Sequence, residues 1–202
     1  MTRRSMAART RDLLLLVLLW AAVTMPFLDK AFHIDDPVHV QQAAHILDHP
    51  TRPLDLEIFW FEWPERLSRS NPVTPPVWQY ELAAGMAAGG VREPVLNAIA
   101  AVHVLVLGIG VYVLAARLLR WPLLAAALVV SSPAAVVGRN LMLDIPMLSY
   151  LVTGVAASVI AVEDGRPGLA AVGALLVGIA TITKLPAVAV LPALSLFLAG
   201  RS

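Results

Sequence analysis

Two adjacent carboxylates, Asp35 and Asp36, are the residues of this chain best suited to chemistry. They follow the first long apolar run, residues 13–28, and ionised side chains at the end of a membrane-spanning segment are costly to keep without a function. A positioned carboxylate can act as a general base. A structural alternative stays open, because Pro37 can open a helix and the carboxylates can cap it.

Three further polar residues, Asp144, Arg139 and Lys184, stand at the ends of later apolar runs. Asp144 can cap the helix that follows it, contact a substrate, or do both. Arg139 and Lys184 can extend from the helix ends toward water, or they can hold the phosphate of a lipid substrate. We expect these residues on the same side of the membrane as the carboxylate pair, which is the strongest indication of a site.

The sequence predicts no metal and no cofactor. The chain has no cysteine, which excludes a thiolate metal site and a cysteine nucleophile. His45 and His49 have the i, i+4 spacing of metal ligands, but no third ligand is evident. His103 lies inside an apolar run and is interpreted as a hydrogen-bonded packing residue. No basic run follows the N-terminus, so no nucleic-acid partner is expected.

These residues must be positioned by membrane-spanning helices. Of the 202 residues, 58% are hydrophobic and 14% are charged, and the mean hydropathy is +0.75. A soluble domain is closer to half apolar and a quarter charged. We therefore predict an all-α integral membrane protein, a polytopic helical bundle packed through small residues. The expected spans are residues 13–28, 95–116, 122–138, 145–162, 169–182 and 185–199.

The distribution of arginine predicts the topology. Four arginines precede the first span and place the N-terminus in the cytoplasm; the run has no small-residue cleavage site typical of a signal peptide. Residues 29–94 then form a long extracytoplasmic loop that carries interfacial helices after Pro37 and from Val77. Its aromatic stretch, residues 54–63, is expected on the bilayer surface. Arg139 and Lys184 are exceptions to the positive-inside rule, which calls for a functional explanation.

The ordered motifs resemble the membrane glycosyltransferases with a GT-C fold, closest to bacterial glycosyltransferase family 39. Asp35-Asp36 stands where those proteins have Asp-Glu, and Asn71 to Trp78, with Pro75-Pro76, resembles their paired-proline loop. Leu141 to Pro146 resembles their Leu-Met-x-Asp-x-Pro boundary, and Thr183-Lys184 their Thr-Lys. Asp36 in place of Glu, and Thr74 where a basic residue often precedes the prolines, depart from the pattern. The resemblance covers the N-terminal part of a longer family pattern.

The resemblance implies an inverting transfer from a polyprenyl-phosphate sugar to a hydroxyl of a protein, lipid or glycan, at the outer face of the bacterial plasma membrane. Asp35 would be the general base, with Asp36 beside it. Asp144 would orient acceptor or sugar. Lys184, with Arg139 as a weaker candidate, would hold the donor phosphate. Pro75, Pro76 and Trp78 would line the substrate site.

Two other functions remain open. Carboxylates in membrane proteins also carry ions or protons in transporters and channels. Here they are predicted at span ends on one face, and no paired broken helices indicate an inverted repeat. A non-catalytic membrane subunit is the other alternative.

Overall fold

The computed structural model describes residues 5–33, 35–60, 63–70, 75–136 and 139–200 of the chain. The arginines at positions 3 and 4 and the loop-motif residues 71–74 lie outside the described residues. The described part is mostly helical and has little sheet, which confirms the predicted all-α membrane fold.

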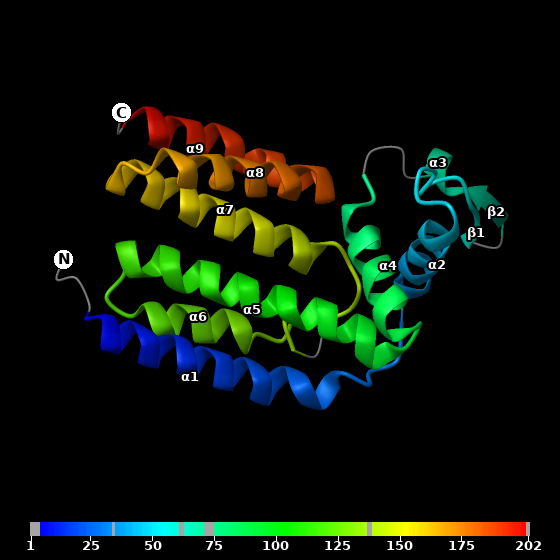
Figure 1. Cartoon of the computed structure of the whole chain (residues 1–202), viewed down its shortest axis with the longest axis horizontal. Coiled ribbons are helices and arrows are strands. Elements are labelled where there is room, and N and C mark those ends of the chain that lie inside the picture. The colour runs from blue at the N-terminus through cyan, green and yellow to red at the C-terminus, as the bar shows by residue number, and fades with distance from the viewer. Residues whose placement is uncertain (1–4, 34, 61–62, 71–74, 137–138, 201–202) are drawn as a thin grey trace.

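The helices form a bundle with a smaller group of elements at one end (Figure 1). The bundle consists of α1 (Met6–Thr24), α5 (Glu93–Leu118), α6 (Pro122–Val130), α7 (Asp144–Asp164), α8 (Pro167–Thr183) and α9 (Val190–Ala199). The end group consists of α2 (Asp36–Asp48), α3 (Leu67–Ser70), α4 (Val77–Gly89) and the strands β1 (Glu57–Trp60) and β2 (Trp63–Arg66). Short 3-10 helices, Met25–Phe27 and Leu185–Ala189, follow α1 and precede α9.

Three helical segments of the described chain are long and apolar enough to cross a bilayer: Met6–Phe27, Glu93–Leu118 and Asp144–Asp164. These correspond to the predicted spans 13–28, 95–116 and 145–162. Two shorter apolar helical segments, Pro167–Thr183 and Leu185–Ala199, correspond to the last two predicted spans. The structure therefore supports a membrane protein through its helix lengths and composition.

Small residues bring α7 and α8 close together. A Cβ atom added to Gly154 would lie 2.9 Å from the carbonyl oxygen of Gly173, and one added to Gly173 would lie 2.9 Å from the backbone nitrogen of Ser158. Any larger side chain at these positions would force the two backbones apart. This contact is the packing by small residues that is typical of helices in lipid.

The predicted span 122–138 differs from the structure, because its helix ends at Val130. The Ser131 hydroxyl donates to the carbonyl oxygen of Ala127, and Pro133, which has no backbone N–H, follows two residues later. Pro186 has a similar effect on the last run, which begins as the 3-10 helix before α9. The β1–β2 hairpin was not predicted.

The long first loop folds onto the end of the bundle through one apolar cluster. Its buried members come from α2, α4, α5 and the segment that precedes α7: Ala43, Ile46, Trp78, Leu82, Ala83, Met86, Leu96, Ala100, Leu141 and Leu143. This cluster packs α2 and α4 against the start of α5 and the segment that precedes α7.

Candidate functional site

The segment that leads into α7 is held by one side chain from α2 and one from α4. The Asp36 carboxylate accepts a hydrogen bond from the backbone N–H of Leu141 at 2.7 Å, and the indole N–H of Trp78 donates to the carbonyl oxygen of Leu141 at 2.6 Å. Asp36 also accepts from the backbone N–H of His33 at 3.2 Å. Both backbone polar groups of Leu141 are therefore satisfied, as buried groups require.

This geometry gives both Asp36 and Trp78 structural positions. A structural role was the alternative left open for the carboxylates, whereas Trp78 was expected to line the substrate site. Asp36 is 2% exposed and Trp78 is 0% exposed. In this structure neither side chain presents a surface to a substrate. Both instead fix the place of Leu141, three residues before Asp144.

Asp35 differs from its neighbour. It occupies the N-cap position of α2, but its side chain makes no capping hydrogen bond. Within the described part of the chain, its partly exposed carboxylate has no hydrogen bond or ion pair. The capping alternative is therefore not what the structure shows for Asp35.

Asp144 and Lys184 form an ion pair. Lys184 directly follows α8, Asp144 is the first residue of α7, and the Lys184 Nζ lies 2.6 Å from the Asp144 Oδ1. The Lys184 side chain is 30% exposed and the Asp144 side chain is 52% exposed. The capping position ahead of α7 belongs to Leu143, so Asp144 does not cap this helix. The pair is accessible from solvent and joins the ends of two bundle helices.

His39 links the two halves of the site. Burial lowers the pKa of His39, the carboxylates of Asp36 and Asp35 oppose this effect, and the charge of Lys184 adds to it. The three charged side chains therefore lie close enough to His39 to act on its charge. The His39 Nδ1 lies 2.9 Å from the amide nitrogen of Gln79, so in this arrangement Nδ1 accepts a hydrogen bond from the amide.

Arg139 is buried beside this group. It is 1% exposed, its Nη2 donates to the carbonyl oxygen of Phe27 at 3.2 Å, and its Nε and Nη1 have no hydrogen-bond partner among the described residues. Burial lowers the pKa of Arg139. The Lys30 Nζ donates to the Arg139 carbonyl oxygen at 2.7 Å. Burial lowers the pKa of Lys30; the charge of Asp36 opposes this effect and the charge of Arg139 adds to it.

The paired prolines end the connection into α4. Pro75 is exposed, Pro76 is partly buried, and the carbonyl oxygen of Pro75 accepts from the backbone N–H of Val77 at 2.9 Å. They lie three residues or fewer from the buried Trp78. Their position at the start of α4 places them at the same end of the molecule as Asp36.

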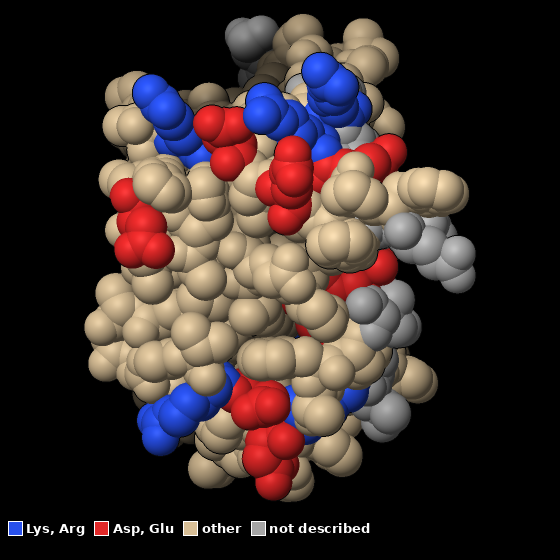
Figure 2. Space-filling model, turned by 90° about the vertical axis from the view of Figure 1, so that its right-hand side faces the viewer, with Lys and Arg blue, Asp and Glu red and all other residues tan. Residues whose placement is uncertain are grey.

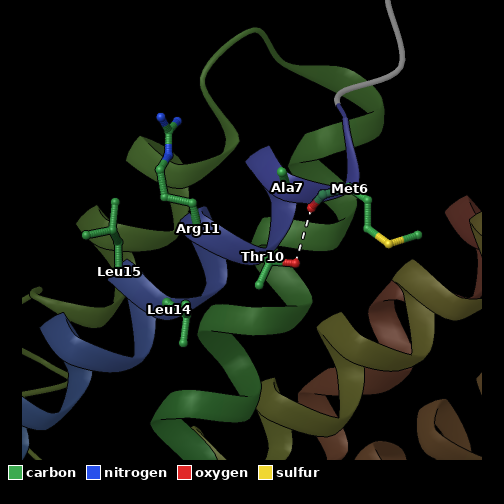
Figure 3. A pocket seen from close by; sticks show the side chains of 6 residues that line it. All are labelled: Met6, Ala7, Thr10, Arg11, Leu14 and Leu15. Atoms are coloured by element: carbon green, nitrogen blue, oxygen red, sulfur yellow. Dashed lines mark hydrogen bonds between the residues drawn. The ribbon is translucent and has the colours of Figure 1, made fainter.

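The charges on this end of the molecule are mixed. Figure 2 shows acidic and basic side chains gathered along two borders of the face, with a broad uncharged area between them. A groove lined by Met6, Ala7, Thr10, Arg11, Leu14 and Leu15 lies near the start of α1, at the opposite end of the bundle (Figures 1 and 3). This apolar groove is therefore separate from the candidate site.

Sequence reasoning missed several residues of the site, among them His39, Gln79 and Lys30. The spacing of Asp36 and His39, three residues apart in a helix opened by Pro37, places both on one helix face and was a usable signal. No local pattern indicates that Gln79 or Lys30 contacts segments far away in the chain. The structure describes no group of three or more potential metal ligands.

The helical membrane fold agrees with a membrane glycosyltransferase of the GT-C type, and the family comparison supports this class. Residues 73–202 match the family of the dolichyl-phosphate-mannose-protein mannosyltransferases, and the chain belongs to this family. The match includes Arg139, Asp144 and Lys184 and begins after Asp35 and Asp36. The comparison with curated proteins found no match, and the comparison with solved structures found none.

Proposed function

We propose that this protein transfers a sugar from a polyprenyl-phosphate donor to an acceptor hydroxyl at the extracytoplasmic face of the membrane, with inversion at the anomeric carbon. Family membership supports glycosyl transfer of the mannosyltransferase type. The observation that carries the proposed mechanism is the contrast between the two neighbouring carboxylates. Asp36 is buried and bonded to backbone, whereas Asp35 is partly exposed and has no partner among the described residues.

Asp35 is the general base in this proposal. The acceptor oxygen attacks the anomeric carbon from the side opposite the phosphate, the bond from that carbon to the phosphate oxygen breaks, and the hydroxyl proton passes to Asp35. The single displacement inverts the anomeric configuration. The products are the glycosylated acceptor and the polyprenyl phosphate. Positioned proton transfer of this kind is typically worth about a hundred- to ten-thousand-fold in rate.

Lys184 and Asp144 receive the reacting groups. The Lys184 ammonium is partly exposed at the end of α8, where a lipid phosphate at the bilayer surface can reach it. A bound phosphate either shares the Lys184 ammonium with Asp144 or displaces Asp144 from it. Asp144 then accepts a hydrogen bond from the sugar or the acceptor. The ion pair in the present structure thus holds the cation in place until the donor arrives.

The other predicted residues contribute less directly. Arg139 is a weaker phosphate candidate than Lys184, because its guanidinium is 1% exposed. Pro75 and Pro76 shape the entrance to α4, and Trp78 supports the site through Leu141. We propose a hydroxyl of a protein, a lipid or a glycan as the acceptor. The bacterial plasma membrane, with the N-terminus in the cytoplasm, is the proposed location.

The test replaces Asp35 with asparagine, which keeps the shape of the side chain and removes its basicity. The full-length protein is incubated with radiolabelled mannose on a polyprenyl phosphate, and membranes supply the acceptors. We expect Asp35→Asn to bind the labelled donor like the parent protein and to lose transfer by at least about a hundredfold.

Asp48→Asn is the matched control, because Asp48 is an exposed carboxylate at the other end of the same helix. It should transfer label at the parental rate. Parental transfer by Asp35→Asn, combined with loss of transfer by an Asp36→Asn protein that keeps the parental Tm, would assign the base to the other carboxylate. If neither substitution changes transfer, neither carboxylate is the base and the proposed mechanism fails. A parent protein that transfers no label would instead favour the transporter or subunit alternative.

A further inference from the structure

A second polar cluster lies between α4 and the bundle, outside the site described above. The Glu81 carboxylate of α4 lies 2.6 Å from the His103 Nε2 of α5 and accepts a short hydrogen bond from the Tyr150 hydroxyl of α7. The His103 Nδ1 lies 2.7 Å from the Ser149 hydroxyl, which in turn lies 2.7 Å from the carbonyl oxygen of Pro146. One carboxylate thus joins three helices: α4, the α5 helix that follows it, and the more distant α7.

The cluster is mostly enclosed by apolar and aromatic groups. Ser149 is 0% exposed, His103 is 7% exposed, and the Glu81 side chain is 26% exposed. The His103 ring packs edge to face against Trp78 and Tyr150, with ring centroids 5.3 Å apart in each case. An ionisable side chain within a membrane-spanning helix is costly, so the pairing of His103 in α5 with the Glu81 carboxylate of α4 indicates a functional role by default.

The same helix, α4, contacts the chain on both sides of Asp144. Trp78 holds the carbonyl oxygen of Leu141, three residues before Asp144, and Glu81 holds the hydroxyl of Tyr150, six residues after it. Trp78 and Glu81 are three residues apart, so they lie on one face of α4. The two contacts fix the first turns of α7 relative to the loop helices.

We infer that Glu81, His103 and Tyr150 are positioning residues that set the place of Asp144 relative to Asp35. This inference rests on the proposed function, because it concerns the site of that reaction. Asp35 is carried by α2, which packs against α4, whereas Asp144 is carried by α7. The position of one carboxylate relative to the other therefore depends on how firmly α4 is attached to α7.

The absence of cysteine from the chain allows a test that does not depend on catalysis. A single reporter is introduced by Met142→Cys, two residues before Asp144, where the parent side chain is half-buried. Its rate of reaction with a maleimide reagent is measured in the purified full-length protein. We expect Glu81→Leu to raise this rate about tenfold and Tyr150→Phe to raise it severalfold, because each removes a bond to a charged group.

Two controls separate positioning from general loosening of the bundle. Glu81→Gln keeps an acceptor for Tyr150 and a hydrogen-bonding group for His103, so it should restore the slow parental rate. Tyr112→Phe removes a buried hydroxyl that bonds Asp12 elsewhere in the bundle, and should leave the reporter unchanged. A second reporter, Ala115→Cys, lies in the buried interior and should react equally slowly in all variants.

Equal reporter rates in the parent, Glu81→Leu and Tyr150→Phe would overturn the inference, and so would a parallel rise at both reporters. Tyr150→Phe removes one hydroxyl and leaves the ring packing intact, so the test stands even where Glu81→Leu does not fold. In the transfer assay, the same two variants should lower the rate more than the affinity for donor. A parent protein that transfers no label would refute the proposed function, while the labelling result would still decide whether α4 positions Asp144.

Discussion

Replacing Asp36 with asparagine should destabilise the protein rather than abolish its chemistry. The two carboxylate oxygens accept backbone N–H groups from Leu141 at 2.7 Å and His33 at 3.2 Å. Asparagine offers only one oxygen, so its amide N–H₂ must face one of these N–H donors inside a site that is 2% exposed. A lost hydrogen bond to a charged group, with a donor left unpaired, costs about 2–3 kcal/mol.

For a chain of this length, that loss corresponds to a decrease of about 4–12 °C in Tm. The assay is thermal unfolding in detergent, followed by circular dichroism, with the parent protein, Asp35→Asn and Asp48→Asn measured beside Asp36→Asn. The exposed Asp48 should change the free energy of unfolding by less than about 0.5 kcal/mol. An unchanged Tm for Asp36→Asn, or an equal loss for Asp35→Asn, would refute the reasoning that distinguishes the two carboxylates.

Three further predictions follow from the site. Burial lowers the pKa of His39 below its ordinary value of 6.5, so the unfolded chain binds this proton at a higher pH than the folded protein does. The free energy of unfolding should therefore fall as the pH drops below about 6.5, by at most ~1.4 kcal/mol per pH unit. Between about pH 8 and pH 5.5, His39→Gln should lose less Tm than the parent protein. Lys184→Met should weaken binding of the labelled donor more than it lowers Tm, and unchanged donor binding would leave Lys184 as a surface lysine. In intact cells, a cysteine from Ser70→Cys should react with an impermeant thiol reagent and one from Gly165→Cys should not; the reverse labelling would contradict the topology.

The sequence predicted the helices of this protein better than their ends. Long apolar runs determine where a helix must lie in lipid, because backbone groups there can be satisfied only within the helix. The end of α6 at Val130 depends instead on Ser131 and Pro133, two residues that an average over hydropathy conceals. The β1–β2 hairpin was missed because residues 54–63, rich in aromatic side chains, also fit a segment on the bilayer surface.

The sequence predicted that the charged residues of the candidate site would lie together at one face, but it gave no indication of their contacts with one another. Charged residues at the ends of separate apolar runs indicated one face, and the structure brings Asp36, Asp35 and Lys184 around His39. The hydrogen bond between Asp36 and Leu141 joins residues 105 positions apart in the chain. Its donor is a backbone N–H, which no sequence pattern marks as the partner of a distant carboxylate. The Glu81–His103 contact was missed for the same reason, since Glu81 belongs to a loop helix and His103 to an apolar run.

Exposure separates two kinds of polar residue at this end of the bundle. Asp36 and Trp78 use their hydrogen-bonding groups on the backbone and are buried, so neither can serve a substrate without releasing Leu141. Asp35, Asp144 and Lys184 remain partly exposed, and the Asp144–Lys184 pair can exchange one partner for a ligand. The proposed mechanism therefore requires opposite effects of mutation: residues of the first kind must act on stability, and residues of the second kind on binding and rate. Unchanged protein stability after substitution of Asp36 or Trp78 would be inconsistent with this division. So would unchanged donor binding after loss of the Asp144–Lys184 pair.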